Sequence, residues 1–158
     1  MLFRKAKAQW KGNLTKGDGR LSVGSGAIDV RYSLKSRLED GQSATNPEEL
    51  LGAAHAGCFT MALAAQLSGA GFTPTQIQTQ AKVSFDKSGD GFAITRVDLE
   101  TLADVAALDD ATFQALAADA KKNCPVSKAL AAIDIGMKAT LKQTGRVPAA
   151  AAGKDEKN

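Results

Sequence analysis

Several residue types that build common active sites are scarce in this chain. Its 158 residues include two cysteines, one histidine, one tryptophan and one tyrosine. Two thiols and one imidazole cannot complete a typical structural zinc site, and we expect neither a metal nor another cofactor. The cysteines, Cys58 and Cys124, also lie too far apart for a C-x-x-C redox motif.

The chain also lacks a block of like charges and a signal-peptide core. Its 20 Lys and Arg residues alternate with 17 Asp and Glu residues, which does not favour nucleic-acid binding. The basic start has no apolar run of signal-peptide length. Residues 50–67 come closest to a membrane span, but His55, Gln66 and several Gly and Ala indicate a core helix. We therefore expect a cytoplasmic protein with no membrane or nucleic-acid partner. In the cytoplasm, cysteines are expected to be reactive rather than structural.

The first 45 residues have the pattern of short strands. Glycine-rich turns separate three runs, which are Ala6–Trp10, Arg20–Val23 and Ala27–Leu34. This pattern predicts a small antiparallel meander. We expect one domain over residues 1–146, because the chain length suits one core. Residues 147–158 have little to bury and are expected to be disordered.

A long apolar helix is predicted to follow the strands. Asn46 can cap it, Pro47 suits its first position, and Glu49 is spaced to complete a capping box. The helix continues to residues 69–71, is apolar on nearly every side and is rich in Ala and Gly. Two sheets or a partner's helix could cover such a helix. We favour the partner, and hence a homodimer.

The remaining residues alternate between strand and helix patterns. The predicted elements are a hairpin of Ile77–Asp86 and Phe92–Val105, helices at Asp109–Lys122 and Val126–Ala132, and a strand at Ile133–Leu141. Runs of strands around one central helix predict an α+β fold rather than a parallel doubly wound sheet.

Each cysteine has two interpretations. Cys58 falls in the middle of the apolar helix, where a thiol is commonly a small core residue with a raised pKa unless a cation lies beside it. Cys124 precedes Pro125 and is predicted to cap the short helix, and a helix N-terminus lowers a thiol pKa. Position alone therefore makes Cys124 the more acidic thiol. Two cysteines beside elements that must pack together suggest a redox couple.

Three other residue types are candidate partners of the cysteines. His55 precedes Cys58 by three residues, so a catalytic pair is conceivable, although a polar residue at a helix interface is the favoured interpretation. Arg31 and Arg37 are the arginines nearest the helix start. Either could lie beside a thiol, but most arginines are solvated surface groups, and that is the alternative interpretation of both. Helix capping explains Glu48 incompletely, which leaves its carboxylate to hold an arginine.

Two segments resemble the cysteine motifs of the OsmC/Ohr family. They are TNPEELLGAAHAGCFTMALA (Thr45–Ala64) and NCPVSKAL (Asn123–Leu130), and the similarity extends over about residues 5–142. His55, where the Ohr branch typically has an aromatic residue, points to the OsmC branch. The resemblance implies an OsmC-like α+β fold, with antiparallel sheets around long central helices, in an intertwined homodimer with two sites at the subunit interface.

The same resemblance implies a thiol peroxidase that reduces organic hydroperoxides. Cys58 would become a sulfenic acid and Cys124 would close a disulfide with it. Arg37 would stabilise the Cys58 thiolate, with Arg31 as the fallback, and Glu48 would hold the arginine. An external dithiol, often a lipoyl group in this family, would restore both thiols. The rival interpretations are a peroxide sensor and a small-molecule-binding dimer, both without turnover.

The spacing of Glu48 and Cys58 sets a geometric condition on this site. They are ten residues apart, which is about 15 Å along a straight helix. Either the helix breaks near Gly52 or Gly57, or Arg37 and Glu48 serve the thiol of the other subunit. We predict the cross-subunit arrangement.

Overall fold

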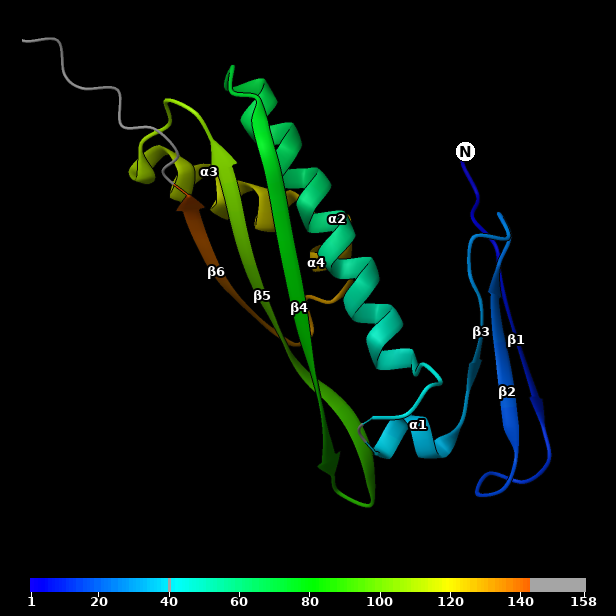
Figure 1. The fold of residues 1–158 in the computed structure, drawn as a ribbon. Helices are drawn as coiled ribbons and strands as arrows, with labels where there is room; N and C mark the ends of the chain where they lie inside the picture. Colours follow the sequence, from blue (N-terminus) through cyan, green and yellow to red (C-terminus); the bar gives the residue numbers. More distant parts are fainter. Residues whose placement is uncertain (40, 143–158) are drawn as a thin grey trace, which may run out of the picture.

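The structure is a computed structural model that describes residues 1–39 and 41–142, so the tail predicted over residues 147–158 lies outside the described residues. The described chain forms two three-stranded sheets and four helices (Figure 1). In chain order they are β1 (Ala6–Lys11), β2 (Asp18–Val23), β3 (Asp29–Tyr32), α1 (Leu34–Leu38), α2 (Pro47–Gly69), β4 (Pro74–Ser88), β5 (Gly91–Val105), α3 (Asp110–Asn123), α4 (Pro125–Ala129) and β6 (Asp134–Lys142).

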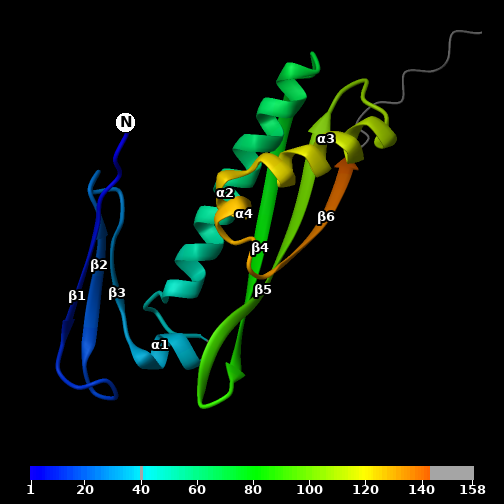
Figure 2. The same cartoon turned by 180° about the vertical axis from the view of Figure 1, so that it is seen from behind.

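The first sheet is the predicted antiparallel meander, in the order β1-β2-β3. Gly19 pairs with Tyr32 across the sheet, and a Cβ at Gly19 would collide with the tyrosine ring, so only glycine fits there. The Trp10 and Tyr32 rings lie 5.4 Å apart. The sheet stands beside the rest of the chain rather than on it (Figures 1 and 2), and most of its residues are exposed. Its faces are thus left largely uncovered.

The second sheet has the order β4-β5-β6 and differs in one respect from the prediction. The β4–β5 hairpin is antiparallel as expected. The β5–β6 pair is parallel, with Arg96 opposite Asp134, so this sheet is mixed rather than antiparallel throughout. The physical reason is that α3 and α4 lie between these strands in the chain and carry it back across the sheet, as a parallel pair requires.

Helices α2, α3 and α4 all lie on one face of this sheet (Figure 2). Helix α2 buries a stripe with helical spacing, which consists of Glu48, Gly52, His55, Phe59, Leu63 and Leu67. Gly52 lets the helix come close to β4. A Cβ at this position would lie 3.5 Å from the Ala81 carbonyl oxygen. The core therefore lies between α2, α3 and the inner face of β5, where Val97 and Leu99 are fully buried.

A short helix, α1, was not predicted. The expected strand Ala27–Leu34 ends at Tyr32, and Ser33 caps α1 by accepting the Ser36 N–H at 3.0 Å. Ser36 in turn accepts the Ser33 N–H at 2.9 Å. A helix of five residues is too short to show an apolar period, so only this pair of serines could have indicated it.

The capping box predicted at the start of α2 forms only in part. The Asn46 side chain accepts the Glu49 N–H at 2.8 Å, as predicted. The Glu49 carboxylate, however, accepts the Thr45 hydroxyl at 2.8 Å rather than closing the box on Asn46. The helix start is still tied to the loop before it, which matters for the site below.

Candidate active site

The two cysteines, 66 positions apart in the sequence, are brought into contact. Cys58 lies in the middle of α2, and Cys124 ends α3 and caps α4, with Pro125 at the first position of α4 as predicted. Both thiols are free; Cys58 is half-buried and Cys124 is fully buried. This contact is the geometry that a redox couple requires.

The surroundings shift the two thiols in opposite directions. Burial raises the pKa of Cys58, and the neighbouring Cys124 adds to this, against a hydrogen bond from the Val126 N–H that lowers it. Burial also opposes ionisation of Cys124. There, hydrogen bonds from the Ser127 N–H, the Ser127 hydroxyl, Cys58 and the Val126 N–H outweigh burial and lower the pKa. Within one chain, Cys124 is therefore the more acidic thiol, in agreement with its place at the helix start.

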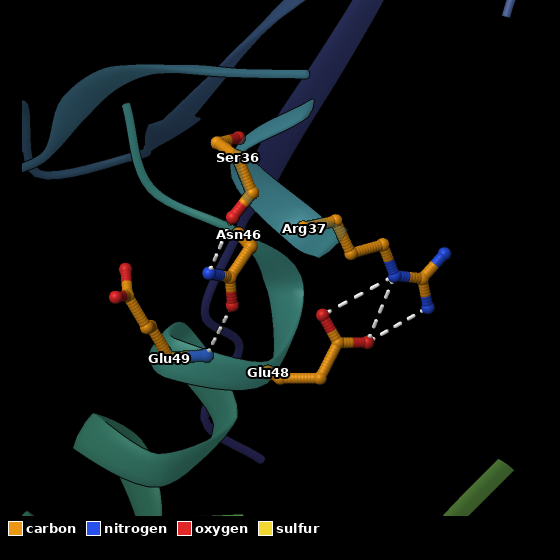
Figure 3. A network of polar contacts seen from close by, with 5 residues as sticks. All are labelled: Ser36, Arg37, Asn46, Glu48 and Glu49. Carbon is orange, nitrogen blue, oxygen red and sulfur yellow. Dashed lines mark hydrogen bonds and ion pairs between the residues drawn. The ribbon is translucent and has the colours of Figure 1, made fainter. Parts of the chain in front are cut away.

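Arg37 and Glu48 form the second part of the predicted site (Figure 3). The Arg37 Nη2 lies 2.7 Å from Glu48 Oε1, and Nε lies 3.0 and 3.2 Å from the two carboxylate oxygens. The Glu48 side chain is 10% exposed and the Arg37 side chain 40% exposed. The guanidinium also lies over the Phe85 ring, 4.5 Å from its centroid, in a cation–π contact. The arginine is thus held by two neighbours, and its Nη1 is not used by the Glu48 pair.

The loop between α1 and α2 explains why this pair forms. Asn46 donates to the Ser36 carbonyl at 3.0 Å (Figure 3). The Ser36 hydroxyl donates to the Thr45 carbonyl at 2.7 Å. These bonds fix α1 against the start of α2, so that Arg37 faces Glu48. The fallback Arg31 lies elsewhere, exposed on β3 and 3.9 Å from Asp18.

The structure keeps the two parts of the site apart within one chain. Helix α2 runs unbroken from Pro47 to Gly69, so the break considered near Gly52 or Gly57 does not occur. Ten residues of helix, about 15 Å, separate Glu48 from Cys58. Of the groups in the described residues that shift the Cys58 pKa, none is a cation.

Ser127 is a site residue that the sequence interpretation did not single out. Its hydroxyl contacts Cys124, and it also lies 2.8 Å from Nε2 of His55, which is fully buried. The signal was present in the spacing, because Ser127 follows the capping residue Cys124 by three positions, where a side chain can reach back to the cap.

Comparison with known proteins decides the family. The sequence profile of the family described as "OsmC-like protein" matches residues 39–138. The chain belongs to the OsmC family. It is 46% identical over 132 residues to Peroxiredoxin OsmC of Escherichia coli, covering 83% of this chain and 92% of that protein. It is 29% identical over 112 residues to the organic hydroperoxide resistance protein OhrB of Bacillus subtilis, covering 70% and 80% of the two chains.

Solved structures confirm the predicted OsmC-like α+β fold. The crystal structure of OhrB from Bacillus subtilis superposes with a TM-score of 0.64 at 27% identity, covering 87% of this chain and 98% of that one. A protein described as an organic hydroperoxide resistance protein OsmC, from Legionella pneumophila, gives a TM-score of 0.69 at 22% identity and covers 89% and 99%. The OsmC resemblance of the two cysteine motifs is thereby confirmed.

Proposed function

We propose that the protein is a two-cysteine thiol peroxidase that reduces organic hydroperoxides to alcohols. The observation that carries the proposal is the contact between a half-buried Cys58 and a buried Cys124. Relatives named for peroxiredoxin activity and for organic hydroperoxide resistance support the substrate class.

Exposure supports Cys58 as the attacking thiol. A peroxide can reach the half-buried Cys58, whereas Cys124 has no exposed surface. The Cys58 thiolate attacks one peroxide oxygen, the O–O bond breaks, and the alkoxide takes up a proton and leaves as the alcohol. Cys124 then attacks the Cys58 sulfenic acid, and water leaves as the disulfide forms. An external dithiol, for which a lipoyl group is our candidate, restores both thiols by exchange.

A homodimer would supply the cation that Cys58 lacks. The helix α2 exposes a second stripe of small and apolar residues opposite its buried one, namely Ala54, Gly57, Met61, Ala65 and Ser68. The first sheet is also largely uncovered. We propose that a second copy covers both surfaces and brings its Arg37–Glu48 pair to the Cys58 thiol. The guanidinium would then favour the thiolate by Coulomb attraction in a low dielectric.

The apolarity of α2 has another possible meaning, which the packing disfavours. The helix is long and apolar enough to cross a membrane by length and composition. Its buried stripe, however, includes the polar His55 and packs on the sheet and on α3. We therefore propose that α2 is the core helix of a cytoplasmic dimer.

Met61→Asp is expected to convert the dimer to monomers. Met61 is 74% exposed in one chain and would face its own copy in an isologous interface, so the substitution places two like charges in an apolar contact. Sedimentation equilibrium measures the result, with Leu102→Asp on the outer sheet face as the matched control. A Met61→Asp protein that remains dimeric would contradict this interface.

Peroxide consumption by the purified protein tests the proposed function. Cumene hydroperoxide is supplied with reduced lipoamide, and hydrogen peroxide is the comparison substrate. We expect many turnovers of the organic peroxide and slower loss of hydrogen peroxide, with none in a Cys58→Ser/Cys124→Ser double variant. Consumption of a single equivalent with lipoamide present would indicate a sensor, and no consumption would indicate a binding dimer.

A further inference from the structure

A buried histidine in this fold has only one of its two ring nitrogens paired. His55 is fully buried, and its Nε2 lies 2.8 Å from the Ser127 hydroxyl, itself only 7% exposed. The other nitrogen, Nδ1, is buried with no hydrogen-bond partner among the described residues. Leaving a polar atom unpaired in a core costs stability. A residue that serves packing alone would not require this arrangement.

The contact continues from Ser127 to the sulfur atoms. The Ser127 hydroxyl bonds to Cys124, and Cys124 contacts Cys58. His55, Ser127, Cys124 and Cys58 thus form a connected row that joins α2 to the start of α4 and back to α2. Ser127 contacts both the histidine and a reacting sulfur.

Burial creates a problem that this row can solve. Cys124 must lose its proton to attack the sulfenic acid, since the thiolate is the nucleophile. With no exposed surface, its sulfur cannot pass the proton directly to bulk water. A buried base within reach of the sulfur, directly or through a hydroxyl, can take up that proton instead.

We propose that His55 accepts the Cys124 proton through the Ser127 hydroxyl during disulfide formation. This inference rests on the proposed peroxidase function and deepens it. Ser127 is the catalytic residue, because it touches the reacting sulfur, and His55 is a positioning residue that acts through it. The proposal gives a role to His55, which the thiol chemistry described above does not use.

The proton transfers balance without another reactant. Initially the Cys124 S–H donates to Ser127 Oγ, the Ser127 O–H donates to His55 Nε2, and Nδ1 carries the imidazole proton. Two concerted transfers leave a Cys124 thiolate and an imidazolium. The thiolate attacks the Cys58 sulfur, the S–O bond breaks, and the leaving hydroxide takes up a proton to become water. His55 supplies that proton through Ser127, so the imidazole is neutral again and no proton is gained or lost overall.

The surroundings of His55 suit a proton acceptor. Burial lowers its pKa, so the imidazole is neutral at pH 7 and its Nε2 lone pair is available. Besides Ser127, the buried residues of the elements packed on α2 are uncharged: Phe113, Ala117 and Ala120 on α3, and Val97, Leu99, Thr101, Ala103 and Val105 on β5. On β4, Lys82 is exposed, as is Lys128 on α4. The titratable groups in the row are thus His55 and the two thiols.

Following the two chemical steps separately tests the inference. Reduced protein is mixed with one equivalent of cumene hydroperoxide and quenched at intervals, and mass spectrometry follows the Cys58 sulfenic acid and the disulfide. His55→Gln keeps a hydrogen-bonding side chain but removes the base, and Ser127→Ala is a smaller change that breaks the row. Thr101→Val is the matched control, because its hydroxyl is equally buried but bonds Thr79 and the Gln78 carbonyl.

We expect His55→Gln and Ser127→Ala to form the sulfenic acid within about twofold of the wild-type rate and the disulfide at least about a hundredfold more slowly at pH 7, the lower end of general-base effects. The wild-type disulfide rate should be flat above pH 7, whereas the variant rates should rise with pH. Thr101→Val should match the wild type in both steps.

Three results would overturn the inference. The first is that His55→Gln and Ser127→Ala both form the disulfide at the wild-type rate and with the wild-type pH profile. The second is that Thr101→Val slows disulfide formation as much as they do. The third is a wild-type protein that forms no sulfenic acid, which would overturn the proposed function and this inference with it. The separate time courses distinguish the third result from the first two.

Discussion

Cys58→Ser is expected to lower the rate of organic hydroperoxide reduction at least about a thousandfold, as removal of a nucleophile does in other covalent mechanisms. A serine hydroxyl is scarcely ionised at neutral pH, so the attacking anion is lost. The substitution changes one half-buried atom, and folding should be preserved. The measurement is the initial rate of cumene hydroperoxide loss with reduced lipoamide.

Cys124→Ser is the informative companion to that variant. It should still reduce one equivalent of peroxide per chain at a rate close to wild type, because Cys58 remains. Turnover with lipoamide should then fall, since the sulfenic acid has no partner with which to form a disulfide. The reverse pattern, with turnover lost in Cys124→Ser and kept in Cys58→Ser, would mean that the more acidic thiol attacks.

Arg37→Met is expected to lower the rate constant for peroxide attack by about a hundredfold to a thousandfold, the loss typical of removing one charge-stabilising donor. In the proposed dimer, the guanidinium favours the Cys58 thiolate and the developing alkoxide. Without it the Cys58 pKa stays raised by burial, so the variant rate should increase with pH. Arg31→Met, on the exposed face of β3, is the matched control and should react like the wild type.

Mixed dimers show which chain supplies the arginine. Cys58→Ser and Arg37→Met chains are unfolded together and refolded, so that half of the dimers contain one chain of each kind. If the site forms across subunits, each mixed dimer has one intact site, and about a quarter of wild-type activity should return. If Arg37 acts within its own chain, no site is intact and no activity should return.

The sequence was sufficient for the main features of the fold because their signals are local. Asn46 and Pro47 predict the start of α2, and alternating residues predict the β4–β5 hairpin. The parallel pairing of β6 could not be predicted in the same way. A strand has the same alternation whichever way its neighbour runs, and the direction of β6 depends on how α3 and α4 cross the sheet.

The candidate site divides in a similar manner. The two cysteine motifs could be found from the sequence by their resemblance to one family. The Arg37–Glu48 contact depends on α1, whose five residues show no apolar period. The link between His55 and Ser127 joins residues 72 positions apart, and no spacing rule within one element reaches that far.

Locating the first oxidised sulfur tests the central claim most directly. The reduced protein is treated with one equivalent of cumene hydroperoxide in the presence of dimedone, which traps sulfenic acids, and the labelled peptide is identified by mass spectrometry. Cys124→Ser protein is treated in parallel, because its sulfenic acid should persist. Our account predicts the label on Cys58 in both proteins, with more in the variant. A label on Cys124 of the wild-type protein, or an unlabelled Cys58 in the variant, would contradict it.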